Sequence, residues 1–135
     1  MSRTDAATLW SLQYRVSVSV ISDIAPELAA MGLDAKELFV LAEIDEHPYP
    51  ADLADRLCMP RPTVTTNLKR LEAARLVRRE IDPADLRRHR LHLTDAGREA
   101  LAHGMAVLVE AFGARLSRLS AAEQAQLQGM LERLV

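Results

Sequence analysis

The chain has 135 residues, of which 49% are apolar and 4% aromatic, and it holds one cysteine. This length suits one domain with helical extensions, and a single thiol excludes an intramolecular disulfide. No apolar run reaches the roughly 18 residues of a membrane span, so we expect a cytoplasmic protein without signal peptide or membrane contact. The net charge of −2 conceals a basic middle, because residues 56–90 carry ten Lys and Arg against four Asp and Glu. Such asymmetry is typical of a chain in which one segment meets phosphate.

A long first helix is predicted to end at Gly32, a residue free to adopt positive φ. Its first apolar stripe has three- and four-residue spacing and comprises Leu9, Leu12, Val16, Val20, Ile24 and Leu28. A second stripe beside it comprises Trp10, Tyr14, Val18 and Ile21. A helix that is apolar on two faces has more surface than one small domain can bury. We therefore expect it to be shared between two subunits, the alternative being a central core helix.

Three shorter helices are predicted next. Asp34 and Glu37 have the spacing of a capping box and begin a helix with an apolar face formed by Leu38, Leu41, Ala42 and Ile44. Pro50 can occupy the first turn of a short helix that continues to Leu57. After a turn over residues 58–61, Pro62 opens a helix that runs to about Ala74 with Val64, Leu68 and Leu71 inward. The spacing of the last two is that of a helix-turn-helix unit.

The second helix of such a unit enters the major groove of double-stranded DNA with its N-terminal end first. The side chains expected to face outward there are Arg61, Thr63, Thr65, Thr66, Asn67, Lys69 and Arg70. Thr methyl groups suit the thymine methyl, Asn pairs with adenine, and Lys and Arg serve guanine or phosphate. The alternative is an ordinary solvated helix face.

A basic hairpin is predicted after this helix, with strands at residues 76–81 and 89–93 and a turn at residues 82–85. Arg87 and Arg88 are expected at its tip, where guanidinium groups meet an anion rather than a core. Arg87 can reach a narrow minor groove, and Asp85 can orient it through a bidentate pair. The alternative is a solvated charged loop. A helix-turn-helix followed by a basic hairpin is the layout of a winged helix-turn-helix.

Two further helices complete the chain. Thr94 is expected to cap a long helix whose stripe comprises Leu101, Met105, Leu108, Phe112, Leu116 and Leu119. Ser120 and Glu123 form another capping box and begin a last helix. We thus expect a mainly α fold with a small β-hairpin wing. Residues 34–97 would form the DNA-binding winged helix, and residues 1–33 and 98–135 a helical dimerisation region.

The run Arg61-Pro62-Thr63-Val64-Thr65, the D-x-R of Asp85 and Arg87, and the run Leu93-Thr94-Asp95-Ala96-Gly97 together resemble the multiple antibiotic resistance regulator (MarR) family. The resemblance covers nearly the whole chain. It implies a homodimer joined through first and last helices that binds a palindromic operator, usually as a repressor. Arg75 departs from the pattern, because the family commonly has Gly there, and a side chain would strain the helix end or end it differently.

Members of the family often bind aromatic acids between the dimer helices and the winged domain. The resemblance therefore implies a small aromatic or anionic effector, with Trp10, Tyr14, Arg15 and Phe39 as candidate contacts. Arg15 stands out, because a charge on a largely apolar helix requires an anionic partner. The alternative is that these four are packing residues.

Other functions find less support. Cys58 is expected to be a partly buried structural thiol, with a redox-sensing regulator as the alternative. Glu43 and His47 lie one helical turn apart, but a metal site needs three or four converging ligands, so we expect no metal. No phosphate-binding loop, dinucleotide motif or activated nucleophile is visible, so we expect neither enzyme nor cofactor. A winged-helix protein-interaction module without DNA remains possible, although it would not need an arginine-tipped wing.

Overall fold

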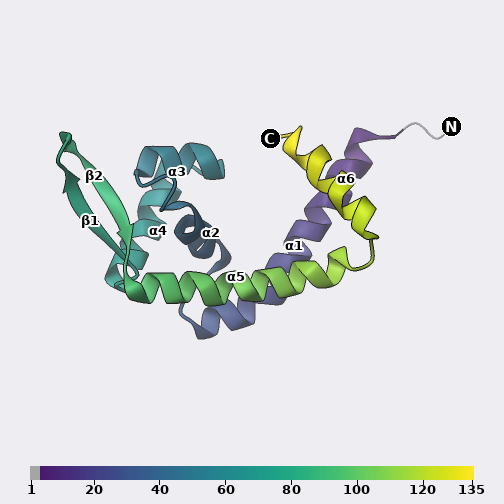
Figure 1. Cartoon of the computed structure of the whole chain (residues 1–135), viewed down its shortest axis with the longest axis horizontal. Coiled ribbons are helices and arrows are strands. Elements are labelled where there is room, and N and C mark those ends of the chain that lie inside the picture. Colours follow the sequence, from purple (N-terminus) through teal and green to yellow (C-terminus); the bar gives the residue numbers. More distant parts are fainter. Residues whose placement is uncertain (1–3) are drawn as a thin grey trace. The chain divides into compact units, whose positions relative to one another are not determined.

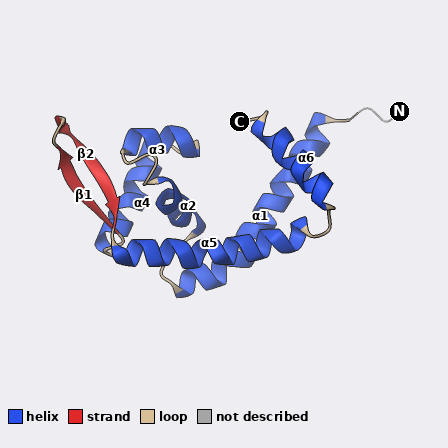
Figure 2. Ribbon diagram, viewed as in Figure 1, coloured by secondary structure: helices blue, strands red, loops and turns tan. Residues whose placement is uncertain are grey.

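A computed structural model describes residues 4–135 (Figure 1). Over this range the chain forms, in order, α1 (Ala6–Ala30), α2 (Ala35–Glu43), α3 (Pro50–Leu57), α4 (Arg61–Ala73), β1 (Val77–Asp82), β2 (Asp85–Leu93), α5 (Asp95–Leu116) and α6 (Ala121–Glu132). The predicted fold, mainly helical with a hairpin wing, is confirmed (Figure 2). No single helix of residues 4–135 has the length and hydropathy to cross a membrane. The length and hydropathy of a membrane span are met only by α1 and α2 taken together, and these two helices are bent by 85° relative to each other.

The chain divides into two compact units. Unit 1 comprises residues 4–24 and Ala106–Val135, and unit 2 comprises Ala25–Met105. Unit 2 therefore holds α2, α3, α4 and the hairpin, while unit 1 holds α6, most of α1 and the second half of α5.

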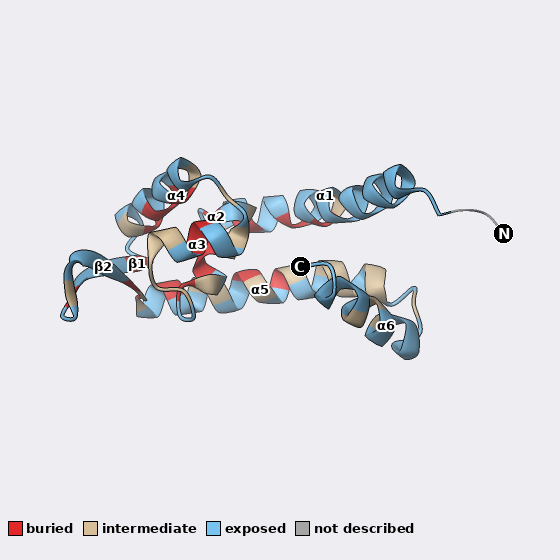
Figure 3. Ribbon diagram, turned by 90° about the horizontal axis from the view of Figure 1, so that it is seen from above, coloured by how far each residue is buried: buried red, intermediate tan, exposed pale blue. Residues whose placement is uncertain are grey.

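Unit 2 has a dense apolar core between α2, α3, α4 and the base of the hairpin. Its fully buried side chains are Leu28, Leu38, Val40, Leu41, Ile44, Leu53, Val64, Leu68, Leu71 and Leu91. In Figure 3 the buried colour follows the inner faces of these helices. The inward positions predicted for α4 are confirmed, whereas Ala42, expected on the apolar face of α2, is exposed.

Unit 1 leaves much of its apolar surface uncovered. Its exposed large apolar side chains are Leu9, Trp10, Leu12, Tyr14, Val16, Val18, Ile21, Val109, Met130, Leu131, Leu134 and Val135. No residue of α6 is buried. One ion pair, Arg115 Nη2 to Asp23 Oδ2 at 2.8 Å, joins α5 to α1 within the unit. The excess apolar surface predicted for the first helix is thus present.

The predicted helix caps form, with one difference. Asp34 Oδ1 accepts the Glu37 N–H at 2.8 Å, but Glu37 itself is buried, so only this half of the expected capping box is made in the described chain. At α6 both halves are present, between Ser120 and Glu123. Thr94 Oγ1 accepts the Gly97 N–H at 3.0 Å and donates to the Arg75 carbonyl at 2.6 Å. This second bond ties the start of α5 to the end of α4.

Helix α4 ends in a left-handed residue although that residue is Arg75. Its φ is 59°. The Leu76 N–H donates to the Leu71 carbonyl and the Arg75 N–H to the Glu72 carbonyl, both at 2.9 Å, which is the Schellman pattern. The departure from glycine therefore leaves this helix end intact and places an arginine in a conformation that costs about 1 kcal/mol.

The hairpin is longer than predicted. Its register runs from Val77 opposite Leu93 to Asp82 opposite Asp85, with an irregularity between Ile81 and Asp82. β2 begins at Asp85 rather than residue 89, so the turn is Pro83-Ala84. Arg87 and Arg88 belong to β2 rather than to the turn, and they lie between the two outermost pairs of the hairpin, Ile81 with His89 and Asp82 with Asp85. Neither arginine has a partner on β1, so both lie in the irregular outer part of the hairpin, next to its turn.

Candidate nucleic-acid interface

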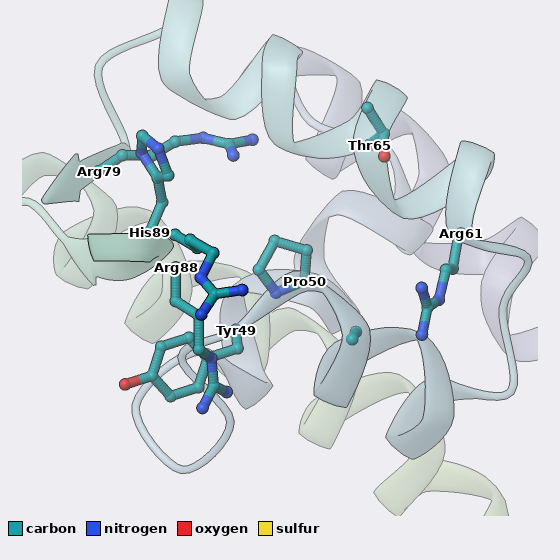
Figure 4. Close-up of a pocket in the computed structure, with 9 residues that line it drawn as sticks. Tyr49, Pro50, Arg61, Thr65, Arg79, Arg88 and His89 are labelled. Atoms are coloured by element: carbon teal, nitrogen blue, oxygen red, sulfur yellow. The ribbon is translucent and has the colours of Figure 1, made fainter. Parts of the chain in front are cut away.

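A basic cleft lies in unit 2 between the start of α3, the N-terminal half of α4 and the wing. It has a volume of about 360 Å³ and is lined by Tyr49, Pro50, Ala51, Arg61, Thr65, Arg79, Arg87, Arg88 and His89. In Figure 4 Arg61 and Thr65 extend from α4, Arg79, Arg88 and His89 from the strands, and Tyr49 and Pro50 from the start of α3. Four lining residues are arginines and none is acidic. A cleft lined by one sign of charge concentrates counter-charged ligands.

The outward face of α4 carries most of the predicted residues. Arg61, Thr65, Thr66, Lys69 and Arg70 are exposed, and Thr63 is half-buried. Arg70 Nη1 lies 3.9 Å from carboxylate oxygens of both Asp34 and Glu37, so its guanidinium already has acidic neighbours. The Thr66 hydroxyl donates to the Pro62 carbonyl at 2.9 Å.

Asn67 was expected on this face, and that expectation is wrong. The residue is 5% exposed, and its Nδ2 is buried without a hydrogen-bond partner among the described residues. The reason is helical periodicity, since Asn67 lies three residues after Val64 and four before Leu71, both inward-facing. Asn67 therefore belongs to the packed face of α4.

Arg87 lies in the wing with a side chain that is 96% exposed. The bidentate pair expected with Asp85 is not formed, because Asp85 Oδ1 accepts the backbone N–H of Arg87 at 3.0 Å and lies 3.9 Å from its Nε. An acidic residue that bonds the backbone two positions on is typical of an Asx turn. Asp85 thus shapes the start of β2 and leaves the Arg87 guanidinium unrestrained.

Arg88 has a different environment from Arg87. Its Cζ lies 3.6 Å from the centroid of the Tyr49 ring, and its Nη2 is 3.9 Å from Asp52 Oδ2. The Tyr49 hydroxyl in turn donates to Asp82 Oδ2 at 2.5 Å. This bond lowers the pKa of Asp82 and raises the pKa of Tyr49, since it stabilises the carboxylate and holds the phenol proton.

Sequence reasoning missed Tyr49, its partner Asp82 and one further arginine of the cleft, Arg79. Arg79 Nε also lies 2.6 Å from Glu72 Oε1, which ties β1 to α4. A weak signal for Tyr49 was available, because the residue before a proline is held extended and here it precedes the first helix of the helix-turn-helix.

Comparison with known proteins agrees with this geometry. A model described as MarR family matches residues 31–88. The HTH-type transcriptional repressor Rv2887 of Mycobacterium tuberculosis is 33% identical over 137 aligned positions, which cover 99% of this chain and 98% of the relative. The chain belongs to the MarR family. It is accordingly a DNA-binding transcriptional regulator, and the resemblance drawn from its motifs is confirmed.

Two solved structures extend the comparison of this MarR-family chain. The Mycobacterium tuberculosis Rv2887 complex with salicylic acid superposes with a TM-score of 0.76 at 27% identity, covering 99% of this chain and 98% of that one. The transcriptional repressor CouR bound to a 23-mer DNA duplex gives a TM-score of 0.78 at 27% identity, covering 98% and 99%.

The remaining candidates of this MarR-family chain lie outside the cleft. Trp10 and Tyr14 stack on α1 with ring centroids 6.5 Å apart, and Arg15 is exposed without an ion-pair partner in residues 4–135. Phe39 is half-buried in unit 2. Cys58 is exposed, so the partly buried thiol expected there is wrong; it caps α3 in the left-handed conformation with φ 53°.

The pair of Glu43 and His47 considered for a metal has a third member. Glu43, Glu46 and His47 bring ligand atoms within 4.8 Å of one another at the end of α2. Glu43 is also 3.4 Å from Arg56 Nε and 3.8 Å from His47 Nε2. This surface cluster is thus partly engaged in ion pairing.

Proposed function

We propose that this MarR-family regulator is a repressor that binds a palindromic operator as a homodimer and is released by a small aromatic or anionic effector. The observation that carries the proposal is the cleft with four arginines and no lining acid, beside the exposed face of α4. A relative of the same fold, CouR, is bound to a DNA duplex in its solved structure. The protein would act where the chromosome lies, in the cytoplasm, without catalysing a reaction.

The DNA contacts follow from the two sides of the cleft. In the major groove we assign base and phosphate contacts to Arg61, Thr63, Thr65, Thr66, Lys69 and Arg70. Arg87 would enter the adjacent minor groove, because its side chain is almost fully exposed to solvent. Asp85 contributes through the backbone turn that positions β2.

Dimerisation is assigned to residues 1–33 and 98–135, and DNA binding to residues 34–97. The apolar surface of unit 1 supports this, since contiguous exposed apolar patches mark interaction sites. A dimer with a two-fold axis presents its α4 helices to half-sites about 10 bp apart.

The effector proposal rests on chemistry and on one relative. Rv2887 was solved with salicylic acid and with p-aminosalicylic acid, both aromatic carboxylates. In unit 1 such a carboxylate would meet Arg15, which is exposed and has no ion-pair partner among residues 4–135, beside the stacked rings of Trp10 and Tyr14. Phe39, the fourth candidate, belongs to unit 2.

The decisive experiment is selection of duplexes from a random DNA pool, followed by titration of the enriched site and of one half-site. We expect an inverted repeat that binds far more tightly than its half. Sodium salicylate added to the complex should release the DNA, with benzyl alcohol as the uncharged control. A pool that shows no enrichment would contradict operator binding and favour a protein-interaction module.

A further inference from the structure

The wing is fastened to the helix-turn-helix at a point beyond its base. The hairpin is two-stranded, and two strands alone are marginally stable in water. At its base the Leu91 N–H donates to the Pro48 carbonyl at 2.8 Å, which extends the ladder by one bond. Farther out Ile81 and Leu86 are exposed, so apolar packing does not fix the outer part. Its orientation therefore depends on side-chain contacts.

Two such contacts meet at Tyr49, and a third lies beside them. Its hydroxyl donates to Asp82 at the outer end of β1, and its ring lies under the Arg88 guanidinium of β2. Arg88 also approaches Asp52 of α3. We propose that Tyr49 is a positioning residue that latches the wing to the start of α3, and that Arg88 belongs to this latch rather than to the DNA-contacting set.

Asp82 makes the latch specific. It is 8% exposed, and its two oxygens have separate tasks: Oδ2 accepts the Tyr49 hydroxyl, and Oδ1 accepts the Ala84 N–H at 2.9 Å. The carboxylate thus connects the turn of the wing to Tyr49 at the register irregularity of the hairpin. A hydrogen bond to an ionised acceptor is stronger than one between neutral groups, so this bond is suited to fixing the orientation of the wing.

Tyr49 itself is held firmly. It has extended backbone, with φ −123° and ψ 138°, and it precedes Pro50, whose ring restricts that conformation. Its carbonyl accepts the Leu53 N–H of α3 at 3.0 Å. Tyr49 is therefore fixed relative to the helix-turn-helix, and the outer part of the wing that it contacts keeps its position relative to α3.

Arg87 and Arg88 therefore have different roles although they are adjacent in the sequence. The Arg88 side chain is 47% exposed and already faces a ring and a carboxylate, whereas Arg87 has open surroundings. The latch keeps β2 in the place from which Arg87 reaches DNA. This inference rests on the proposed operator binding.

The test is a double-mutant cycle with Tyr49→Phe and Arg87→Ala, titrated against a duplex that the wild-type protein selects from a random pool. Tyr49→Phe retains the ring under Arg88 and removes only the bond to Asp82. We expect it to weaken binding about tenfold in the dimer, and Asp82→Asn to behave alike. In the Arg87→Ala background Tyr49→Phe should have almost no further effect, because a residue that acts through Arg87 loses its role with it.

The matched control is Asp45→Asn, which removes an exposed carboxylate pair with Arg98 elsewhere in unit 2. It should leave affinity unchanged. A second readout needs no DNA: amide exchange at Leu91, the residue bonded to Pro48 beside the latch, should become faster in Tyr49→Phe and stay unchanged in Asp45→Asn.

Unchanged affinity in Tyr49→Phe, or losses that add in the double variant, would overturn the latch. Unaltered exchange at Leu91 would overturn it as well, even for a protein that selects no duplex. If no duplex is selected but the Leu91 amide of Tyr49→Phe still exchanges faster, operator binding is refuted and the latch is supported.

Discussion

The two units of the chain differ in how completely each buries its own apolar surface. Unit 2 encloses a core of fully buried aliphatic side chains and leaves only Ile81 and Leu86 among its large apolar residues exposed, both on the hairpin. Unit 1 has three buried apolar residues, Val20, Ile24 and Val107, and a long series of exposed ones. Unit 2 therefore buries its apolar side chains within itself, whereas unit 1 leaves an apolar surface that a partner can cover.

Charge is distributed in the opposite way. Residues 56–90, which lie entirely in unit 2, carry the basic excess, and the rest of the chain has seven Lys and Arg against fifteen Asp and Glu. Unit 2, which buries its apolar side chains, has the polar cleft lined by arginines. Unit 1, which exposes them, has apolar grooves along α1, α5 and α6. This division supports the proposal that one unit binds nucleic acid and the other a second copy of the chain, and the proposal can be tested one unit at a time.

The largest effect is expected in the core of unit 2. Leu68→Ala removes a fully buried side chain of α4 and should lower the free energy of unfolding by about 2–5 kcal/mol. Urea unfolding measures this loss. The control is Leu131→Ala in α6, a half-exposed position of unit 1, which should instead weaken self-association. A dimer weakened by Leu68→Ala as strongly as by Leu131→Ala would remove the distinction between core and interface.

A charge placed on the apolar face of unit 1 should separate the subunits. Leu12 lines a groove with Phe112 and Leu116, and Glu at that position would be buried unpaired in a dimer at about 3 kcal/mol per subunit. Sedimentation equilibrium should show Leu12→Glu as a monomer that retains the helical circular-dichroism spectrum. Leu86→Glu, the same kind of change on unit 2, should remain dimeric. A Leu12→Glu protein that still dimerises would place the interface elsewhere.

Arg87→Ala should act on DNA and leave stability alone. An exposed side chain contributes little to folding, so the melting temperature should not change. Binding should fall by about 1–3 kcal/mol per subunit, and the salt dependence should flatten by about one unit per subunit, since one fewer counterion is released. Titrations at several salt concentrations provide both values. An unaltered slope would mean that the wing lies off the DNA.

Arg75→Gly should stabilise unit 2. The residue has φ 59°, where glycine avoids a penalty of about 1 kcal/mol, so the melting temperature should rise by a few degrees. Arg75→Ala serves as the control, because it removes the guanidinium but retains the strained backbone. Equal stabilities of the Gly and Ala variants would show that the left-handed conformation is not strained.

The smallest effect concerns acid. The folded protein lowers the pKa of Asp82, so the contribution of Asp82 to stability is present above its unfolded pKa, near 4, and is lost as the pH falls through the folded value. Melting temperatures between pH 3 and 6 should therefore fall less steeply for Tyr49→Phe than for wild type. Identical slopes would mean that the bond from Tyr49 does not set the titration of Asp82.

The sequence was sufficient for the fold because periodicity and caps are local. Spacing placed Val64, Leu68 and Leu71 inward, and capping residues located the starts of α2, α5 and α6. The same periodicity places Asn67 inward, whereas the suitability of its amide for reading adenine favours an outward position, and periodicity decides.

The site was predicted less well because its decisive contacts join distant residues. Tyr49 and Asp82 are 33 positions apart, and nothing in the sequence near either one indicates the other. The start of β2 was predicted too late for a related reason. Its first residues include Arg87 and Arg88, which have no partner in the register, and a pattern of apolar residues does not reveal such an irregularity.

The run Leu93-Thr94-Asp95-Ala96-Gly97 has a consequence for how the family is recognised. Thr94 joins the end of α4 to the start of α5, and a Cβ at residue 97 would overlap the carbonyl oxygen of Leu76. Gly97 therefore has no room for a side chain, and Thr94 is held by its two hydrogen bonds, whatever DNA sequence the protein binds. A search based on this run detects a way of joining a strand to a helix and carries no information about the operator. Regulators with unrelated targets can share it, and target specificity must be sought on the exposed face of α4 and along β2.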